Sequence, residues 1–193
     1  MTGATRDREA TRQRILLAAE REFAKHAYEH VTVRAVAAAA GVNVALISRY
    51  FGSKLGLFRE VVDGDTRFAR VIDGDPDGLP RRMAEFVFAH LRAARVSPAI
   101  AAMNRSTSSP EVRALLQERL ENSVLAPLTA VLGGGPEARM RATVATALFV
   151  GTNTVRRLLG PQTWGGADDA TVVEELTQVF GLCLRGPAPL PLG

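Results

Sequence analysis

Apolar residues recur along this chain every three or four positions, which is the spacing of one buried face of an α-helix. Alanine, a strong helix former, is abundant, and the alternating pattern of a β-strand is absent. The pattern therefore predicts an all-α fold of about nine helices. The clearest stripes are Ile15, Leu16, Ala19 and Phe23; Val33, Val36, Ala37 and Ala40; Met83, Phe86, Val87, His90 and Leu91; and Val172, Leu176, Val179, Phe180 and Cys183.

Residues that favour the start of a helix support this division of the chain. Side chains that can cap a helix, or a proline suited to a first helical turn, precede predicted helices at Thr32, Asn43, Ser53 and Pro110. The helix from Pro110 is expected to run to about Leu132. The following residues 133–136, Gly-Gly-Gly-Pro, lack the Gly-Lys-Ser/Thr of a phosphate-binding loop and predict a turn between helices.

Composition excludes several classes of protein. Of the 193 residues, 47% are hydrophobic and 23% charged, which is too apolar for a disordered chain. The longest apolar run, from Thr143 to Gly151, is far shorter than the ~18 residues of a membrane span. The charged amino terminus does not resemble a secretory signal, and the single cysteine, Cys183, cannot form an internal disulfide. We therefore expect a cytoplasmic protein without a membrane partner.

Positive charge is concentrated at one end of the chain. The first 60 residues carry ten Arg or Lys against six Asp or Glu, whereas the other 133 carry fourteen of each. The whole net charge of +4 therefore lies in the first third. This distribution indicates an anionic partner for that part of the chain and a neutral body after it.

Residues 32–51 have the organisation of a helix-turn-helix. Small side chains at Ala37 and Ala38 let a second helix approach closely, Gly41 supplies the turn, and Val42 fills the angle between the helices. Asn43 is expected to cap the second helix. The inward side chains of that helix are expected to be Leu46 or Ile47 together with Tyr50 or Phe51. Such a pair can place its second helix in the major groove of DNA, although an ordinary helical hairpin has the same pattern.

The residues in and around this hairpin resemble the TetR family of transcriptional repressors. The resemblance covers about residues 10–62, while the rest of the chain is similar only in being helical and of suitable length. It rests on Arg14-Ile-Leu-Leu-Ala-Ala-Glu-Arg-Glu-Phe23, Val31-Thr-Val-Arg-Ala-Val-Ala, Ala40-Gly-Val-Asn, Ile47-Ser-Arg-Tyr-Phe-Gly-Ser-Lys and Leu57-Phe58.

The resemblance implies both an organisation and a function. A three-helix DNA-binding head is expected at 1–52 and a ligand-binding and dimerisation body at 53–186, with a disordered tail at 187–193 that is rich in proline and glycine. The protein is expected to bind a palindromic double-stranded DNA operator as a homodimer and, as is usual in the family, to act as a repressor. A small, mostly apolar effector is expected to release it.

Nine residues of the head are candidate DNA contacts: Thr32, Arg34, Asn43, Val44, Ala45, Ser48, Arg49, Tyr50 and Lys54. Thr32 and Arg34 can meet a phosphate, and Thr32 can cap its helix at the same time. The start of the recognition helix, at 43–45, is expected nearest the bases, where valine and alanine offer only apolar contact.

The later residues of the recognition helix differ in role. Arg49 is the candidate base or phosphate contact, although an exposed arginine is often only solvated. Tyr50 and Lys54 resemble phosphate clamps. The family often has Tyr at the position of Ser48 and His at that of Tyr50, so Ser48 is a shorter hydrogen-bond donor here.

Basic residues also precede the first apolar stripe, at Arg6, Arg8, Arg12 and Arg14. A flexible basic arm of this kind can enter a minor groove. The interleaved Asp7 and Glu9 favour a solvated segment before the first helix instead.

The body is expected to hold the effector and the dimer surface. The segment 86–91 is apolar almost all round, which predicts a buried helix, and the resemblance implies that it lines the effector pocket. The candidate lining residues are Phe68, Met83, Phe86, His90, Met103, Asn104 and Leu116, for each of which plain core packing is the alternative. The helices at Ala138–Leu159 and Thr171–Leu184 are the candidate dimer surface, the first through its small residues and the second through its apolar stripe. The small residues of the first are Ala142, Ala145, Ala147 and Gly151.

Two other classes of function fit the sequence less well. An enzyme is disfavoured because His26, His30 and His90 are scattered without metal-ligand spacing, and no nucleophile elbow or nucleotide-binding loop is present. No cofactor or metal is therefore expected. A helical protein-interaction module would leave the basic first third unexplained.

Overall fold

The structure, a computed structural model, describes residues 3–63, 67–92 and 109–185 of the chain. Within these ranges the regular elements are helices and helical turns, and no strand is present, so the predicted all-α class is confirmed. The described residues form two compact units. The first, here called the head, comprises 3–63 and 109–119, and the second, the body, comprises 67–92 and 120–185.

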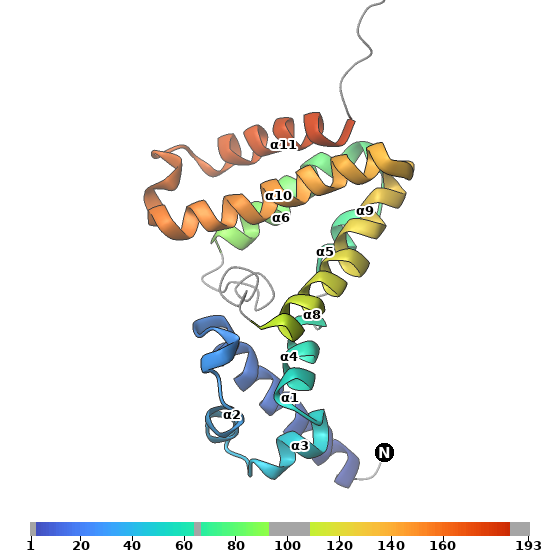
Figure 1. The fold of residues 1–193 in the computed structure, drawn as a ribbon. Coiled ribbons are helices and arrows are strands. Elements are labelled where there is room, and N and C mark those ends of the chain that lie inside the picture. The colour runs from blue at the N-terminus through green and yellow to red at the C-terminus, as the bar shows by residue number, and fades with distance from the viewer. Residues whose placement is uncertain (1–2, 64–66, 93–108, 186–193) are drawn as a thin grey trace, which may run out of the picture. The chain divides into compact units, whose positions relative to one another are not determined.

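The head is built from five α-helices around one apolar core (Figure 1). They are α1 (Gly3–Lys25), α2 (Val33–Ala40), α3 (Ala45–Phe51), α4 (Lys54–Asp63) and α8 (Pro110–Leu120). All five contribute to the core, which includes Ile15, Phe23, Val36, Ile47, Phe51, Leu57, Phe58, Val112 and Leu115. The head therefore extends past the predicted boundary at residue 52, since α4 and α8 bury their apolar faces in the same core.

Helix α1 begins at Gly3, so the basic residues from Arg6 to Arg14 are helical. The prediction of a separate segment before the first helix is wrong. Arginine, glutamate and alanine, which are frequent in this segment, are good helix formers, and the buried Ile15, Ala19 and Phe23 anchor the second half of the helix.

Three predicted caps are present as hydrogen bonds. The Thr32 hydroxyl accepts from the backbone N–H of Ala35 at 3.1 Å, and the Asn43 side-chain oxygen accepts from that of Ala45 at 2.9 Å. The Ser53 hydroxyl accepts from the N–H of Gly56 at 3.0 Å. These bonds satisfy N–H groups that a helix start leaves without a partner, and so fix where α2, α3 and α4 begin.

The body contains α5 (Arg67–Ile72), α6 (Leu79–Arg92), α9 (Ala126–Val131), α10 (Gly135–Leu159) and α11 (Asp169–Arg185). A π-helical turn at Glu121–Leu125 precedes α9, so α8, this turn and α9 continue one another as the predicted long helix from Pro110. The Gly-Gly-Gly turn separates α9 from α10 as expected, with Gly133 and Gly134 at positive φ. Helix α6 packs along α11, and α10 packs against α6, α9 and α11.

Helix α6 is amphipathic rather than buried all round. Val87 and Leu91 are buried, but Arg81, Glu85 and Arg92 are exposed. Arg81 Nη1 lies 3.5 Å from Glu174 Oε2, and Arg92 pairs with Asp169, so this polar edge meets charged residues of α11. The prediction of a fully buried helix is therefore wrong, because the charged residues that flank the apolar run at 86–91 lie on an exposed edge of the helix.

Helix α10 buries part of the surface that was predicted to face a second copy of the chain. Ala142 and Ala145 are fully buried against the body's own helices, so their assignment to a dimer surface is wrong. Val172, Leu176 and Phe180 of the stripe on α11 are also buried within the single chain, so their assignment to that surface is wrong as well. Ala147 and Gly151 are exposed on the opposite side of α10.

None of the helices in the described ranges combines the length and the apolar character that crossing a membrane requires.

Gly41 controls the angle between α2 and α3, which gives a prediction about stability. Its φ of 64° and ψ of 41° are left-handed, and its N–H and that of Val42 donate to the carbonyls of Ala38 and Ala37 at 3.1 and 3.0 Å.

A Cβ added to Gly41 would meet nothing within 4 Å. A Gly41→Ala substitution should therefore lower the free energy of unfolding only through the strained backbone conformation, by about 1–2 kcal/mol. Urea unfolding followed by circular dichroism measures the loss. Gly41→Asn should cost less, because asparagine tolerates this conformation, and equal stability of all three proteins would contradict the assignment.

Candidate nucleic-acid interface

The helix-turn-helix separates a buried face from an exposed one. On α3, Ile47 and Phe51 are buried in the head core, while Leu46 and Tyr50 are half-buried beside them. The opposite face is open to solvent and carries Val44, Ala45, Ser48 and Arg49. Val44, at 39% exposure, is an apolar side chain without cover in the head. The short helix thus presents small, apolar and basic groups outward from a fixed base.

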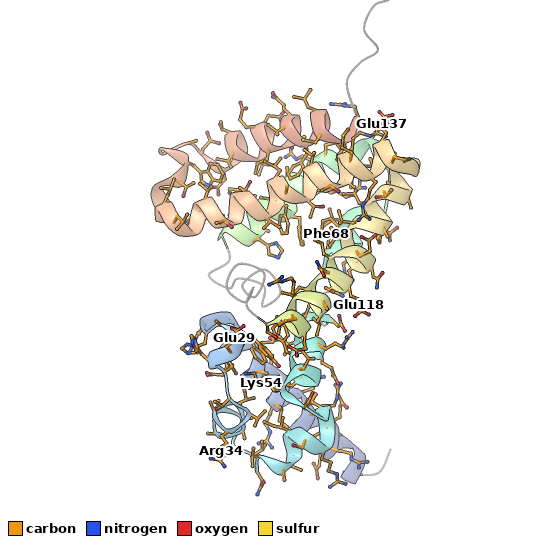
Figure 2. The ribbon with its side chains drawn as sticks, in the orientation of Figure 1. Glu29, Arg34, Lys54, Phe68, Glu118 and Glu137 are labelled. Carbon is orange, nitrogen blue, oxygen red and sulfur yellow. The ribbon has the colours of Figure 1, made fainter. Side chains whose placement is uncertain are left out.

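The other candidate DNA contacts lie at the starts of neighbouring elements. Thr32 and Arg34 are exposed at the beginning of α2, and Figure 2 shows Arg34 directed away from the head core. Asn43 is exposed at the start of α3, where its side chain serves as the cap. Thr32 and Asn43 therefore have a structural role whether or not they touch a ligand.

Lys54 lies against an aromatic ring that sequence reasoning did not connect with it. Its Nζ is 4.2 Å from the centre of the Tyr28 ring, a cation–π contact that holds the side chain at the start of α4. Partial burial lowers the pKa of Lys54, and the nearby Glu29 partly offsets this. Burial raises the pKa of Tyr28, with further increases from Glu111 and Glu29. The raised pKa of Tyr28 keeps its phenol neutral at neutral pH, so the Lys54 Nζ rests on an uncharged ring.

Tyr28 is itself fixed by the core. Its ring centre lies 5.9 Å from that of Phe23 and 5.2 Å from that of Phe58. The Lys54 ammonium is thus positioned by a chain of ring contacts that reaches the centre of the head. No local sequence signal connects these residues, which are far apart along the chain.

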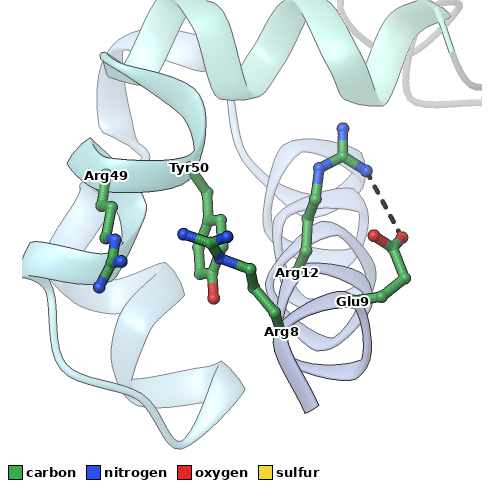
Figure 3. A pocket seen from close by; sticks show the side chains of 5 residues that line it. All are labelled: Arg8, Glu9, Arg12, Arg49 and Tyr50. Atoms are coloured by element: carbon green, nitrogen blue, oxygen red, sulfur yellow. Dashed lines mark ion pairs between the residues drawn. The ribbon is translucent and has the colours of Figure 1, made fainter. Parts of the chain in front are cut away.

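A cleft of about 290 Å³ opens between α1 and α3 (Figure 3). It is lined by Arg8, Glu9, Arg12, Arg49 and Tyr50. Arg12 Nη1 lies 3.9 Å from Glu9 Oε1, and its guanidinium also pairs with Glu60 and lies 5.5 Å from the centre of the Phe51 ring. Of the lining residues, only Arg49 and Tyr50 were candidates from the sequence. The spacing of Arg8 and Arg12 places them on one helix face, a signal that becomes usable once α1 is known to begin at Gly3.

The body holds a separate cluster of aromatic residues. The Phe86 ring centre lies 5.6 Å from that of Phe68, 4.2 Å from that of His90 and 5.5 Å from that of Phe149. His90 Nδ1 lies 2.8 Å from the Phe86 carbonyl oxygen, and both residues belong to α6. Phe68 comes from α5 and is labelled in Figure 2. Phe149, from α10, was not among the predicted lining residues.

The remaining predicted lining residues do not all join this cluster. Met83 is fully buried on α6 in the body. Leu116 lies instead in the core of the head, on α8. Met103 and Asn104 fall outside the described residues. The structure therefore brings together Phe68, Phe86 and His90 of the predicted set.

No group of three or more His, Cys, Asp or Glu side chains with the geometry of a metal site occurs among the described residues. The acidic residues at the start of α11 have a structural role. Asp168 Oδ1 accepts from the N–H of Thr171 at 2.9 Å, and this bond lowers the pKa of the carboxyl group. Asp168 therefore caps the start of α11.

Comparison with solved structures gives the same fold over nearly the whole chain. NalD, the secondary repressor of the MexAB-OprM multidrug efflux pump in Pseudomonas aeruginosa, superposes with a TM-score of 0.71 at 24% identity, covering 93% of this chain and 98% of NalD. Salmonella enterica GusR gives a TM-score of 0.73 at 20% identity over 92% and 96% of the two chains. Bacillus subtilis FadR in complex with stearoyl-CoA gives 0.66 at 19% identity over 91% and 99%. At these identities the likeness establishes the fold.

Sequence comparison extends the likeness beyond the fold. The HTH-type transcriptional repressor SCO4008 of Streptomyces coelicolor is 36% identical over 91 residues, which are 45% of this chain and 47% of that protein. The match thus spans about half the length of this relative. Residues 15–61 match the family described as "Bacterial regulatory proteins, tetR family", and residues 77–184 match "Tetracyclin repressor-like, C-terminal domain". Because the second match alone spans more than half of the 193 residues, the chain belongs to the TetR family of regulatory proteins.

Proposed function

We propose that this protein is a ligand-responsive transcriptional repressor that binds a palindromic DNA operator as a homodimer and is released by a small, mostly apolar effector. The single observation that carries the proposal is the exposed face of α3, whose Val44, Ala45, Ser48 and Arg49 stand over a buried base of Ile47 and Phe51. Family membership and the repressor SCO4008 support the direction of regulation.

The exposed face suits a major groove because of its mixture of groups. Val44 and Ala45 offer apolar contact to thymine methyl groups, and Arg49 can donate to guanine or to a phosphate. Thr32, Arg34, Ser48, Tyr50 and Lys54 are assigned to phosphates, which position a protein on DNA without reading its sequence. Tyr28 holds the Lys54 ammonium ready for such a contact.

This assignment predicts the effect of removing two cations. Operator DNA is first selected from random duplexes with the full chain, and affinity is then measured at several salt concentrations. Arg49→Ala and Lys54→Ala should each weaken binding by about tenfold. Lys54→Ala should also reduce the slope of log affinity against log salt by about 0.9 for each bound copy, because one phosphate is no longer neutralised.

Matched controls are available in the head. Lys25, the other lysine of the chain, and Arg21 are both exposed on α1 and are not assigned to DNA. Lys25→Ala and Arg21→Ala should leave affinity within about twofold, while circular dichroism should show unchanged helix content in all four variants. Equal losses for all four substitutions would mean that only total charge matters and would refute the individual assignments.

The proposed dimer surface is an exposed apolar stripe on α10. Met140, Val144, Ala147, Gly151, Val155 and Leu158 recur every three or four residues and are all exposed. Leu158 is 80% exposed, and Leu182 on α11 is 74% exposed. A Cβ added to Gly151 would meet nothing within 4 Å in the single chain, which leaves room for a partner helix to approach closely. Apolar residues this exposed favour burial against a second copy.

Charge placed on the exposed leucines of α10 and α11 should separate the two copies of the chain. Leu158→Asp combined with Leu182→Asp should give the mass of one chain by light scattering, since burying an unpaired carboxylate in an apolar interface is unfavourable. Affinity for the palindrome should fall together with the mass. Leu17→Asp, at another exposed leucine on α1, is the control and should remain a dimer. A variant that retains the mass of two chains would rule out this surface.

The aromatic cluster of Phe68, Phe86, His90 and Phe149 is the proposed effector site. Its rings come from three helices, and a ring-lined site favours a mostly apolar ligand with a polar group near the imidazole. FadR, which shares the fold, was captured with stearoyl-CoA, a ligand with a long apolar chain. Such a ligand would release DNA by binding more tightly to a dimer whose recognition helices are wrongly spaced for the two half-sites.

A displacement screen tests the effector proposal. Fatty acids, acyl-CoA esters and planar aromatic compounds are added to the protein bound to fluorescent operator, and thermal melting is recorded in parallel. At least one apolar compound should release DNA and raise the melting temperature, because a ligand stabilises the state that it binds. Phe86→Ala should weaken both effects by about tenfold, and Phe88→Ala, outside the cluster on the same helix, should not. Release that survives Phe86→Ala unchanged would contradict this location.

A further inference from the structure

The cleft between α1 and α3 carries more positive than negative charge, and two of its three arginines come from α1 and not from the recognition helix α3. Its lining residues carry three guanidinium groups, from Arg8, Arg12 and Arg49, and one carboxylate, from Glu9. Arg12 is already engaged by Glu9 and Glu60. Arg8 and Arg49 are exposed, and neither forms an ion pair within the part of the chain that the structure describes. Two guanidinium groups therefore face the cleft with their charge uncompensated.

The third available group is the Tyr50 hydroxyl. Figure 3 shows Tyr50 and Arg49 projecting from α3 and Arg8 reaching across from α1, with the Arg12–Glu9 pair on the other side. Tyr50 is half-buried, and its ring packs edge-on against Phe51, with ring centres 6.2 Å apart. The phenol is thus held in place, while Arg8 and Arg49 are exposed beside it.

We infer that this cleft binds a phosphate of the DNA backbone, held between Arg8 of α1 and Arg49 and Tyr50 of α3. This inference rests on the proposed function and adds Arg8 to the DNA-binding residues. A phosphodiester carries one negative charge and two free oxygens, which match the forked guanidinium donors and a phenol O–H. Because Arg49 also belongs to the exposed face of α3, the bound phosphate would flank the bases that this face contacts.

The two arginines that α1 contributes to the cleft, Arg8 and Arg12, have different roles. Arg8 lies one turn before Arg12, whose guanidinium connects α1 to Glu60 of α4 and to the ring of Phe51 on α3. Arg12 is therefore a positioning residue that fixes this part of α1 beside α3. Arg8 is the group that meets the ligand.

The test compares three variants of the full chain on the selected operator. Arg8→Ala should weaken binding by about tenfold and reduce the salt slope by about 0.9 for each bound copy. Arg8→Lys should keep the salt slope, because it keeps the charge, but should recover only part of the affinity. Arg14→Ala, which removes an exposed arginine of the same helix that does not line the cleft, should leave both values unchanged.

A second measurement locates the contact on the DNA. Operators carrying a single uncharged methylphosphonate linkage at each backbone position in turn are bound by the native chain and by Arg8→Ala. The native chain should lose about tenfold at one linkage in each half-site, and Arg8→Ala should lose nothing further there. Tyr50→Phe should lessen the sensitivity at that same linkage, because only the hydroxyl is removed.

The outcomes separate this inference from the proposed function. If the native chain binds no selected duplex, the proposed function fails and this inference fails with it. If the native chain binds its operator while Arg8→Ala behaves as Arg14→Ala does, the function stands and the phosphate cleft is refuted. Inorganic phosphate added at constant ionic strength gives the remaining arm: thermal stabilisation that requires Arg8, with no effect of Arg8→Ala on DNA binding, would mean a free-anion site and would also overturn the inference.

Discussion

The structure of the head depends on the burial of one face of a seven-residue helix, α3. A helix of this length is not stable alone, since few hydrogen bonds compensate for the loss of chain entropy. Ile47 and Phe51 attach it to a core that α1, α2, α4 and α8 complete. Everything that α3 can present outward, including Arg49, is held in place only while those two side chains remain buried.

The same core controls the cations around α3. Phe23 and Phe58 hold the Tyr28 ring, and that ring holds the Lys54 ammonium. Arg12 lies over Phe51 and is paired with Glu60 of α4. Some basic residues of the head are thus engaged with other side chains, as Arg59 is in its 3.0 Å ion pair with Glu118, and others remain available to a ligand. The excess of positive charge in the first third of the chain therefore identifies a ligand-binding surface only once the paired basic residues are set apart from the available ones.

Predictions were correct where the interaction joins residues close in the sequence and failed where it joins distant segments. Thr32, Asn43 and Ser53 were recognised as caps because each acts on a backbone N–H two or three residues away. The turn at Gly41 was recognised for the same reason, and the family was identified from motifs confined to the first third. Errors arose where a helix face had to be assigned to a partner. Ala142 and Ala145 are small enough to pack against a second copy of the chain, yet the body buries them itself. Leu116 was grouped with Phe86, yet it packs in the head.

By itself, then, the sequence determined the helical class, the starts of α2, α3 and α4, the helix-turn-helix and the family, because these depend on periodicity, short-range hydrogen bonds and a local motif. Only the tertiary structure decided which faces are buried, how α4 and α8 join the head, and which distant side chains meet. Arg8 shares a cleft with Arg49 and Tyr50 because α1 and α3 both pack against α4, and Phe149 meets Phe68 and Phe86 because α10 packs on α6. Helical periodicity specifies that a face is apolar or charged, but the partner of that face is selected by packing between segments far apart in the chain.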